Sequence, residues 1–173
     1  YSFFNAFNYL PPIIGFSSVG WKHSVANIEA TGEFVWNLAT RSLADAMNAS
    51  AAHVPAEVDE FELAGLTPVP SRLVAPARVL ESPVNFECKL TQLIRLQGAD
   101  QTPADAWLVL GEVVAAHIDQ DVLVDGIYDT ARAQPILRFE NLTLGYNRHP
   151  AVHHPRGEVA AGSLLAIVGP NGA

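Results

Sequence analysis

The stretch that decides the fold is the first 24 residues, Tyr1-Ser-Phe-Phe-Asn-Ala-Phe-Asn-Tyr-Leu-Pro-Pro-Ile-Ile-Gly-Phe-Ser-Ser-Val-Gly-Trp-Lys-His-Ser24. Residues 2–7 are short and aromatic and are followed by Pro11 and Pro12, which predicts a strand that ends in a turn. Residues 13–18 predict the returning strand, and residues 21–24 predict the start of a helix. The sequence therefore opens with a β-hairpin that leads into a helix.

The start of this helix carries several hydrogen-bond donors. A helix N-terminus presents unpaired backbone N–H groups and the positive end of the helix dipole. Lys22, His23 and Ser24 add side-chain donors there, so the segment predicts a seat for a phosphate group. An ordinary hairpin with a serine-capped helix explains the same residues, since serine is a common N-cap.

The rest of the sequence alternates short helical and longer extended patterns. Ser42 is a cap candidate for the second helix, and Pro83 interrupts the first long strand. The two long strands predict an antiparallel ribbon of a barrel. The patterns predict helices at residues 24–30, 42–52 and 57–64, and strands at 33–39, 78–96 and 107–118.

Composition excludes several classes of protein. The 173 residues are 49% hydrophobic and 16% charged, without a run of the roughly 18 apolar residues that a membrane span needs. A net charge of -8 argues against a nucleic-acid or anionic-membrane surface, so an anionic cofactor must be held locally. Cys88 is the only cysteine, which excludes an internal disulfide and fits a cytoplasmic location. Its place in an expected strand predicts a buried residue rather than a redox thiol.

A series of short motifs in residues 1–137 resembles the flavin reductase-like family of FMN-binding split barrels. The resemblance implies a mainly β fold with short helices, a split β-barrel that lacks its first strands at the N-terminus. It also implies a homodimer, because the flavin site of this family is completed at the subunit interface. The motifs are Tyr1–Phe7, Pro11–Pro12, Gly15–Ser18, Lys22–Ser24, Thr31–Asn37, Glu60–Phe61, Glu87–Cys88, Gly111–Val114 and His117–Asp119.

The resemblance also implies a set of site residues. Asp and Thr commonly follow the lysine in this family, whereas His23 and Ser24 stand here. His117 resembles the histidine that approaches the flavin face where the nicotinamide enters; as a lone histidine it would otherwise be a hydrogen-bonded residue at a strand end. The cofactor-binding residues expected from the resemblance are Ser2, Phe3, Phe4, Asn5 and Ala6 beside the ring, Ser17 and Ser18 near the ribityl chain or phosphate, and Lys22, His23 and Ser24 at the phosphate.

The activity implied is NAD(P)H-dependent flavin reduction, with hydride passing from the nicotinamide to N5 of the flavin. The cofactor carries this chemistry and the protein orients it, so no catalytic triad is expected. An alternative is a barrel that binds FMN or heme without turnover, because fold alone does not fix function.

Residues 138–173 resemble a different family, the ATP-binding subunit of ABC transporters. The chain ends before the second Gly, the Lys and the Ser/Thr that a working phosphate loop requires, so we expect no ATP hydrolysis. The junction is either an artificial join of two gene fragments, which we favour, or a natural fusion. Histidines 149, 153 and 154 lack a nearby carboxylate or Cys partner, and no metal site is expected. The vestigial nucleotide residues are Tyr146, Gly169, Pro170, Asn171 and Gly172.

Overall fold

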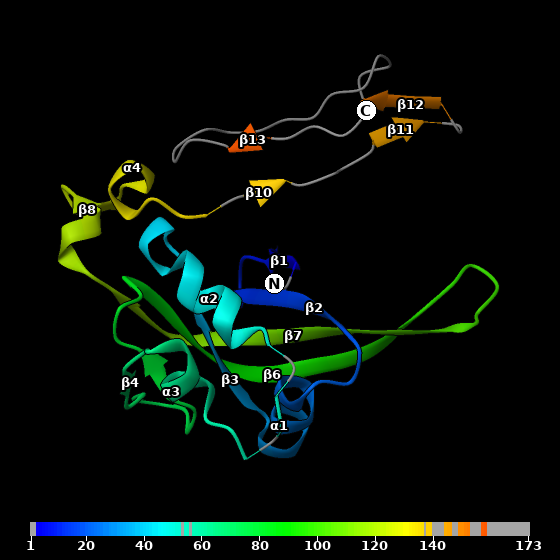
Figure 1. Cartoon of the computed structure of the whole chain (residues 1–173), viewed down its shortest axis with the longest axis horizontal. Coiled ribbons are helices and arrows are strands. Elements are labelled where there is room, and N and C mark those ends of the chain that lie inside the picture. Colours follow the sequence, from blue (N-terminus) through cyan, green and yellow to red (C-terminus); the bar gives the residue numbers. More distant parts are fainter. Residues whose placement is uncertain are drawn as a thin grey trace. The chain divides into compact units, whose positions relative to one another are not determined.

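The computed structural model describes residues 3–52, 54–55 and 57–136, and further along the chain it describes the backbones of four short strands. The chain divides into two units, residues 1–119 and residues 120–173. The larger unit is built on a five-stranded antiparallel sheet (Figure 1), which confirms the expectation of a mainly β fold with short helices. In spatial order its strands are β1 (Phe3–Asn8), β2 (Ile13–Val19), β7 (Pro103–Ile118), β6 (Val84–Gln97) and β3 (Glu33–Asn37).

The predicted N-terminal hairpin is confirmed as β1 and β2. β2 pairs in turn with β7, from Val19 opposite Ala106 to Ile13 opposite Glu112. At Gly15 a β-carbon would lie 2.8 Å from the carbonyl oxygen of Val109, closer than real contacts allow. The hairpin therefore fits against β7 only because this position carries no side chain.

The two long strands expected from the sequence are confirmed as the antiparallel pair β6 and β7. The interruption at Pro83 separates β6 from the short β5 (Arg78–Val79), which pairs with β4 (Pro68–Val69). The far halves of β6 and β7 extend beyond β3 and join through a turn at residues 98–102 (Figure 1).

Residues 84–90 of β6 alternate between apolar and polar side chains. The apolar set faces one side of the sheet and the polar set faces the other. On the apolar side the Phe16 and Phe34 rings meet edge to face, with centroids 5.6 Å apart. Trp36 and Phe86 stack at 5.1 Å on the same side. This side is the hydrophobic core, whose buried members are Ile14, Ile28, Phe34, Cys88 and Val109.

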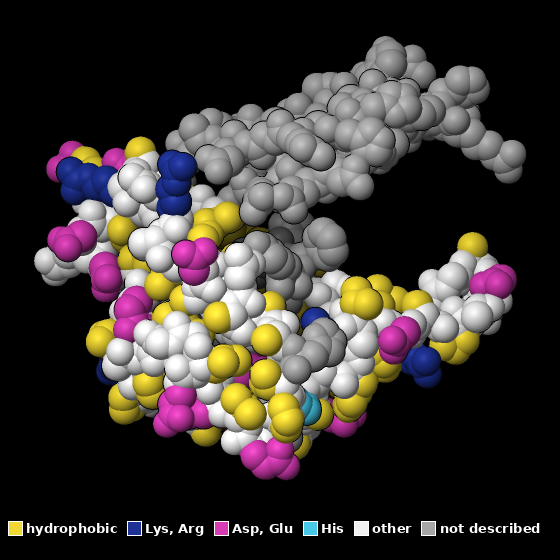
Figure 2. All heavy atoms as spheres, in the orientation of Figure 1, with side chains coloured by type: hydrophobic (Ala, Val, Ile, Leu, Met, Phe, Trp, Pro, Cys, Tyr) yellow, Lys and Arg dark blue, Asp and Glu magenta, His cyan; other side chains and the backbone are white. Residues whose placement is uncertain are grey.

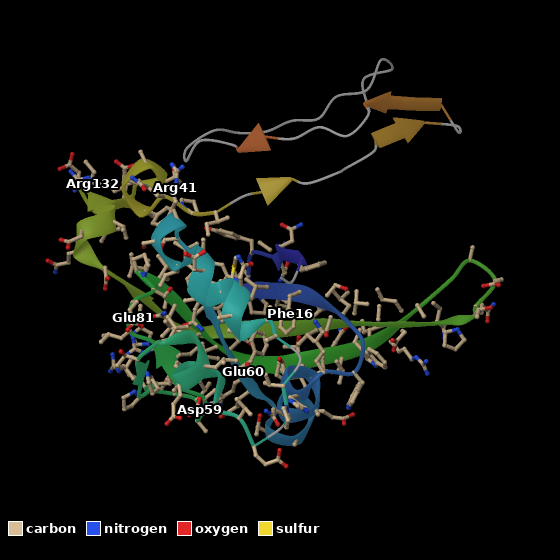
Figure 3. All side chains as sticks on the ribbon, in the orientation of Figure 1. Phe16, Arg41, Asp59, Glu60, Glu81 and Arg132 are labelled. Atoms are coloured by element: carbon tan, nitrogen blue, oxygen red, sulfur yellow. The ribbon has the colours of Figure 1, made fainter. Side chains whose placement is uncertain are left out.

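Short helices flank the sheet. Helix α1 (His23–Thr31), expected at residues 24–30, buries Val25 and Ile28. Helix α2 (Ala44–Ser50) follows the 3-10 turn Arg41–Leu43. The prediction that Ser42 caps it is wrong, because Leu43 is the cap residue and the Ser42 hydroxyl bonds that of Thr40 at 2.9 Å. The carboxylate of Asp59 caps α3 (Glu60–Ala64) by accepting from the backbone N–H of Phe61 (Figure 3).

The second unit begins with a 3-10 turn (Gln120–Val122), the hairpin of β8 (Leu123–Val124) and β9 (Ile127–Tyr128), and α4 (Thr130–Ala133). Beyond these, β10 (Arg138–Phe139) pairs with β13 (Gly157–Glu158), and β11 (Leu144–Tyr146) pairs with β12 (His149–Val152). The predicted nucleotide residues 169–172 lie outside the described residues, as does the side chain of Tyr146. Within the described part of the chain, no helix is long and apolar enough to cross a bilayer.

Candidate functional site

A tight turn joins the end of β2 to the start of α1. The Ser18 hydroxyl donates to the carbonyl of Gly20 at 3.2 Å, and the Lys22 backbone N–H donates to the same oxygen at 3.1 Å. Gly20 has φ +81°, a conformation that disfavours any side chain. The turn brings the predicted residues Ser17 and Ser18 next to the predicted residues of the helix start. Ser18 itself is buried and Ser17 is half-buried.

The N-terminus of α1 has no side-chain cap. Lys22 is the cap residue, in extended conformation, and its side chain makes no capping hydrogen bond. The serine-capped alternative is therefore wrong, because the helix begins at His23 and Ser24 lies in its first turn. Lys22, His23 and Ser24 are all exposed. An exposed ammonium group beside uncapped helical N–H groups fits an anionic ligand.

β1 runs alongside the same end of β2. Phe3 lies opposite Ser17, and Asn5 lies opposite Gly15. The Asn5 side chain accepts from the backbone N–H of Ala6 at 2.9 Å, and both residues are exposed. Ser2 and the side chains of Phe3 and Phe4 lie outside the described residues. The predicted ring-binding and phosphate-binding segments are thus neighbours on one edge of the sheet.

His117 lies at the other end of β7, in contact with a buried carboxylate. Its Nε2 is 2.6 Å from Oε1 of Glu87, whose side chain is fully buried, whereas 22% of the His117 side chain is exposed. Burial alone would raise the pKa of Glu87. The backbone N–H groups of Arg72 and Leu73, together with the His117 ring, outweigh burial and lower the pKa of this carboxyl to about 2.

The polar face of the sheet supports the loop between α3 and β6. Glu87 accepts the backbone N–H groups of Arg72 at 2.8 Å and Leu73 at 2.6 Å. Glu33 accepts that of Ala75 at 2.8 Å, and Glu81, within the loop, accepts that of Thr67 at 3.1 Å. Glu87 on β6 and Glu33 on β3 thus hold the middle of this loop against the sheet, whereas the bond between Glu81 and Thr67 joins two residues of the loop itself.

A second polar group lies next to this pair. Asn85 is opposite both His117 in β7 and Asn37 in β3, so the three side chains share a face. The Asn85 amide donates to Oδ1 of Asn37 at 2.9 Å. Arg78 donates to Oδ1 of Asn85 at 3.3 Å and to the carbonyl of Pro70 at 3.1 Å. The Arg78 guanidinium thus ties the loop to the sheet.

The two ends of the expected site are far apart within one chain. Ser17 lies opposite Leu108, and His117 follows nine residues later on β7 (117 minus 108). At about 3.3 Å per residue this separates them by roughly 30 Å along the strand. The fold therefore brings the β1, β2 and α1 residues together and leaves His117 at a different place.

The roles of Glu87, Asn85 and Arg78 were not predicted from the sequence. A signal for two of them was present, because residues 85 and 87 are polar and alternate with the apolar 86 and 88. That alternation predicts a polar face. The partners of Glu87 in the loop lie 14 and 15 residues away and His117 lies 30 residues away, beyond the reach of local patterns.

The fold and these residues define a small antiparallel β domain with an uncapped helix start after β2 and a buried carboxylate–histidine pair between the interior strands β6 and β7. Residues 1–137 match the family described as flavin reductase like domain, and the chain belongs to this family. The match includes every site residue predicted outside the C-terminal segment.

Relatives known from sequence cover most of this chain. It is 35% identical to an uncharacterized protein of Halalkalibacterium halodurans over 144 residues, 80% of this chain and 68% of that protein. It is 32% identical to an uncharacterized protein of Aquifex aeolicus, over 73% of this chain and 64% of that protein. The chain thus spans about two thirds of the length of these relatives.

Solved structures share the fold. Nitrilotriacetate monooxygenase component B from Bacillus cereus superposes with a TM-score of 0.74 at 27% identity, over 95% of this chain and 76% of that one. Flavoredoxin of Desulfovibrio vulgaris gives 0.70 at 23% identity, over 95% and 78%. A split-barrel protein of Shewanella frigidimarina gives 0.69 at 23% identity, over 96% and 74%. The last two likenesses establish the split-barrel fold alone.

Proposed function

We propose that this chain is the FMN-binding part of a flavoprotein oxidoreductase in which NAD(P)H reduces the flavin. The observation that carries the proposal is the family match over residues 1–137. When bound, the flavin supplies the redox chemistry by accepting a hydride at N5. The chain itself has to hold the phosphate, orient the ring and leave one face open for the nicotinamide.

The phosphate end of the proposed site has suitable donors. Lys22 supplies a positive charge, and the first turn of α1 adds uncapped N–H groups. Acidic side chains are spread over the face seen in Figure 2, in keeping with the net charge of -8. Attraction to an anion is therefore local to this turn, with Ser17, His23 and Ser24 as further donors.

We further propose a homodimer. Ser17 on β2 and His117 on β7 are roughly 30 Å apart along the strand direction, too far for both to contact one bound flavin within a chain. In a homodimer, the His117 of a second copy could approach the flavin face of the first. Tyr9 and Leu10, in the β1–β2 turn, are 92% and 82% exposed, and a partner surface would cover such side chains.

The second candidate is a barrel that binds FMN or heme without turnover. The bond from His117 to Glu87 favours it, because this histidine already has the hydrogen-bonded partner that a structural residue would have. A cytoplasmic location stays a prediction. The ATP-binding fragment over residues 138–173 also stays a prediction, without support from the family match, which ends at residue 137.

Anaerobic mixing of the FMN-loaded chain with NADH, and separately with NADPH, distinguishes the two candidates. Loss of the oxidised flavin absorbance after either addition is the expected result. Bound flavin that stays oxidised with both nucleotides, yet is bleached by dithionite, would select the non-enzymatic alternative. Free FMN under the same conditions is the control for reduction in solution.

A further inference from the structure

Glu87 is a buried carboxylate that the proposed chemistry does not use. Its side chain is fully buried, and burying an ionised carboxylate is costly unless hydrogen bonds satisfy it. Three donors do so: the backbone N–H groups of Arg72 and Leu73, and Nε2 of His117. Two of them belong to the loop and one to β7, so a single carboxylate joins the loop to the histidine.

The donor and acceptor roles in this cluster are fixed by chemistry. An ionised carboxylate only accepts hydrogen bonds, and a backbone N–H only donates. With Arg72 N–H already on Oε1, the 2.6 Å contact to His117 is favourable only when Nε2 carries a hydrogen. In the neutral ring the other nitrogen, Nδ1, is then an acceptor.

Nδ1 of His117 makes no hydrogen bond within the part of the chain that the structure describes, and 22% of the side chain is exposed. A ring without the Glu87 contact would exchange between its two tautomers and rotate about its side-chain bonds. The carboxylate removes both freedoms.

We propose that Glu87 is a positioning residue that holds His117 as the Nε2–H tautomer and so presents Nδ1 to a ligand. The ligand is a hydrogen-bond donor to the neutral ring; its identification as a flavin or nicotinamide nucleotide rests on the proposed function. The same carboxylate holds the backbone of Arg72 and Leu73 beside the ring, so the loop and the histidine are set by one group.

A purely structural role for Glu87 is the competing account. In that account the carboxylate anchors the loop, and the tautomer of His117 is incidental. Glu33 provides the matched comparison, because its carboxylate also accepts a loop N–H, that of Ala75 at 2.8 Å, with no contact to a histidine. Glu33→Gln weakens a loop anchor and leaves His117 untouched, whereas Glu87→Gln changes both.

Nitrogen NMR of the full chain, uniformly labelled with ¹⁵N and free of flavin, tests the proposal. Long-range proton–nitrogen correlations identify the protonated ring nitrogen, and His117→Gln assigns the signal among the six histidines. In the pH range where the ring is neutral, we expect a pyrrole-type shift at Nε2 and a pyridine-type shift at Nδ1. A predominant Nδ1–H tautomer in the unmodified chain would overturn the proposal, whatever the variants do.

The variants complete the test. Glu87→Gln should convert the single tautomer to a mixture of both, while Glu33→Gln should leave the His117 signal unchanged. The amide oxygen of Gln can still accept from Nε2, so an unchanged Nε2–H signal in a folded Glu87→Ala chain, which has no acceptor there, would show that the carboxylate does not position the ring. If the Glu87 variants do not fold, the unmodified chain still tests the tautomer, since a predominant Nδ1–H form there overturns the proposal. Flavin binding is measured on separate samples. Its failure would contradict the proposed function, whereas the tautomer signals of the flavin-free chain test the role of Glu87.

Discussion

Gly111 in β7 lies directly against the ring of Phe34 in β3, although β6 runs between their two strands. A β-carbon on Gly111 would overlap the Cε1 and Cζ atoms of this ring. Phe34 is buried and belongs to the core with Cys88 and Val109. The glycine therefore makes room for the aromatic centre of the sheet.

Replacing this glycine should destabilise the domain by overpacking. We expect Gly111→Ala to lower the free energy of unfolding by about 1–3 kcal/mol, measured by urea denaturation. The control is Gly98→Ala in the exposed turn, whose new β-carbon would meet the flexible side chain of Asp100. That change should stay within about 0.5 kcal/mol. Equal effects of the two substitutions would contradict the packing described here.

The low pKa of Glu87 predicts a defined dependence of stability on pH. The folded chain lowers the pKa of this carboxyl from 4.5 to about 2, so the folded state binds its proton less readily than the unfolded state. The stabilisation is present above about pH 4.5 and is lost as the pH falls through about 2. Because Gln does not titrate, Glu87→Gln should remove this carboxyl's part of the acid-induced loss of stability.

Urea unfolding of the unmodified chain and of Glu87→Gln, between pH 2 and pH 6, measures how far their free energies of unfolding differ at each pH. Glu81 and Asp100 also have lowered pKa values, through hydrogen bonds from Thr67 and Thr102, and they contribute equally to both chains. The two curves should therefore converge as the pH falls. Parallel curves across the whole range would show that Glu87 is not stabilised as an anion.

Cys88 should be chemically inert in the folded chain. The thiol is fully buried, and burial raises its pKa to about 12, so almost none of it is thiolate at neutral pH. A disulfide exchange reagent should react with this single thiol only after denaturant is added. Fast reaction in native buffer, at the rate of the unfolded chain, would contradict its burial.

Lys22 should contribute to flavin affinity through its charge. Its side chain does not cap α1, so Lys22→Ala removes the ammonium group and leaves the helix start intact. We expect FMN to bind about tenfold or more weakly, the effect of losing one charge-assisted hydrogen bond. The control is Lys89→Ala, which removes the other lysine of the chain, exposed on β6. Equal losses in both variants would mean that only net charge matters.

Local patterns predicted the framework of the fold and only part of the candidate site. Pro11, Pro12 and the aromatic run marked the hairpin, and long extended patterns marked β6 and β7, because these signals depend on neighbouring residues. The cap of α2 was misplaced because a 3-10 turn precedes that helix. The Glu87–His117 pair was missed because it depends on the strand register, which joins residues 30 positions apart.

Equilibrium dialysis of the full chain against FMN, with bound flavin counted per subunit, tests the central claim most directly. The account predicts one FMN per subunit, with affinity reduced by Lys22→Ala and unaffected by Lys89→Ala. A folded chain that retains no flavin, at FMN concentrations well above the dissociation constants of other flavoproteins, would contradict the proposal that this chain holds the cofactor.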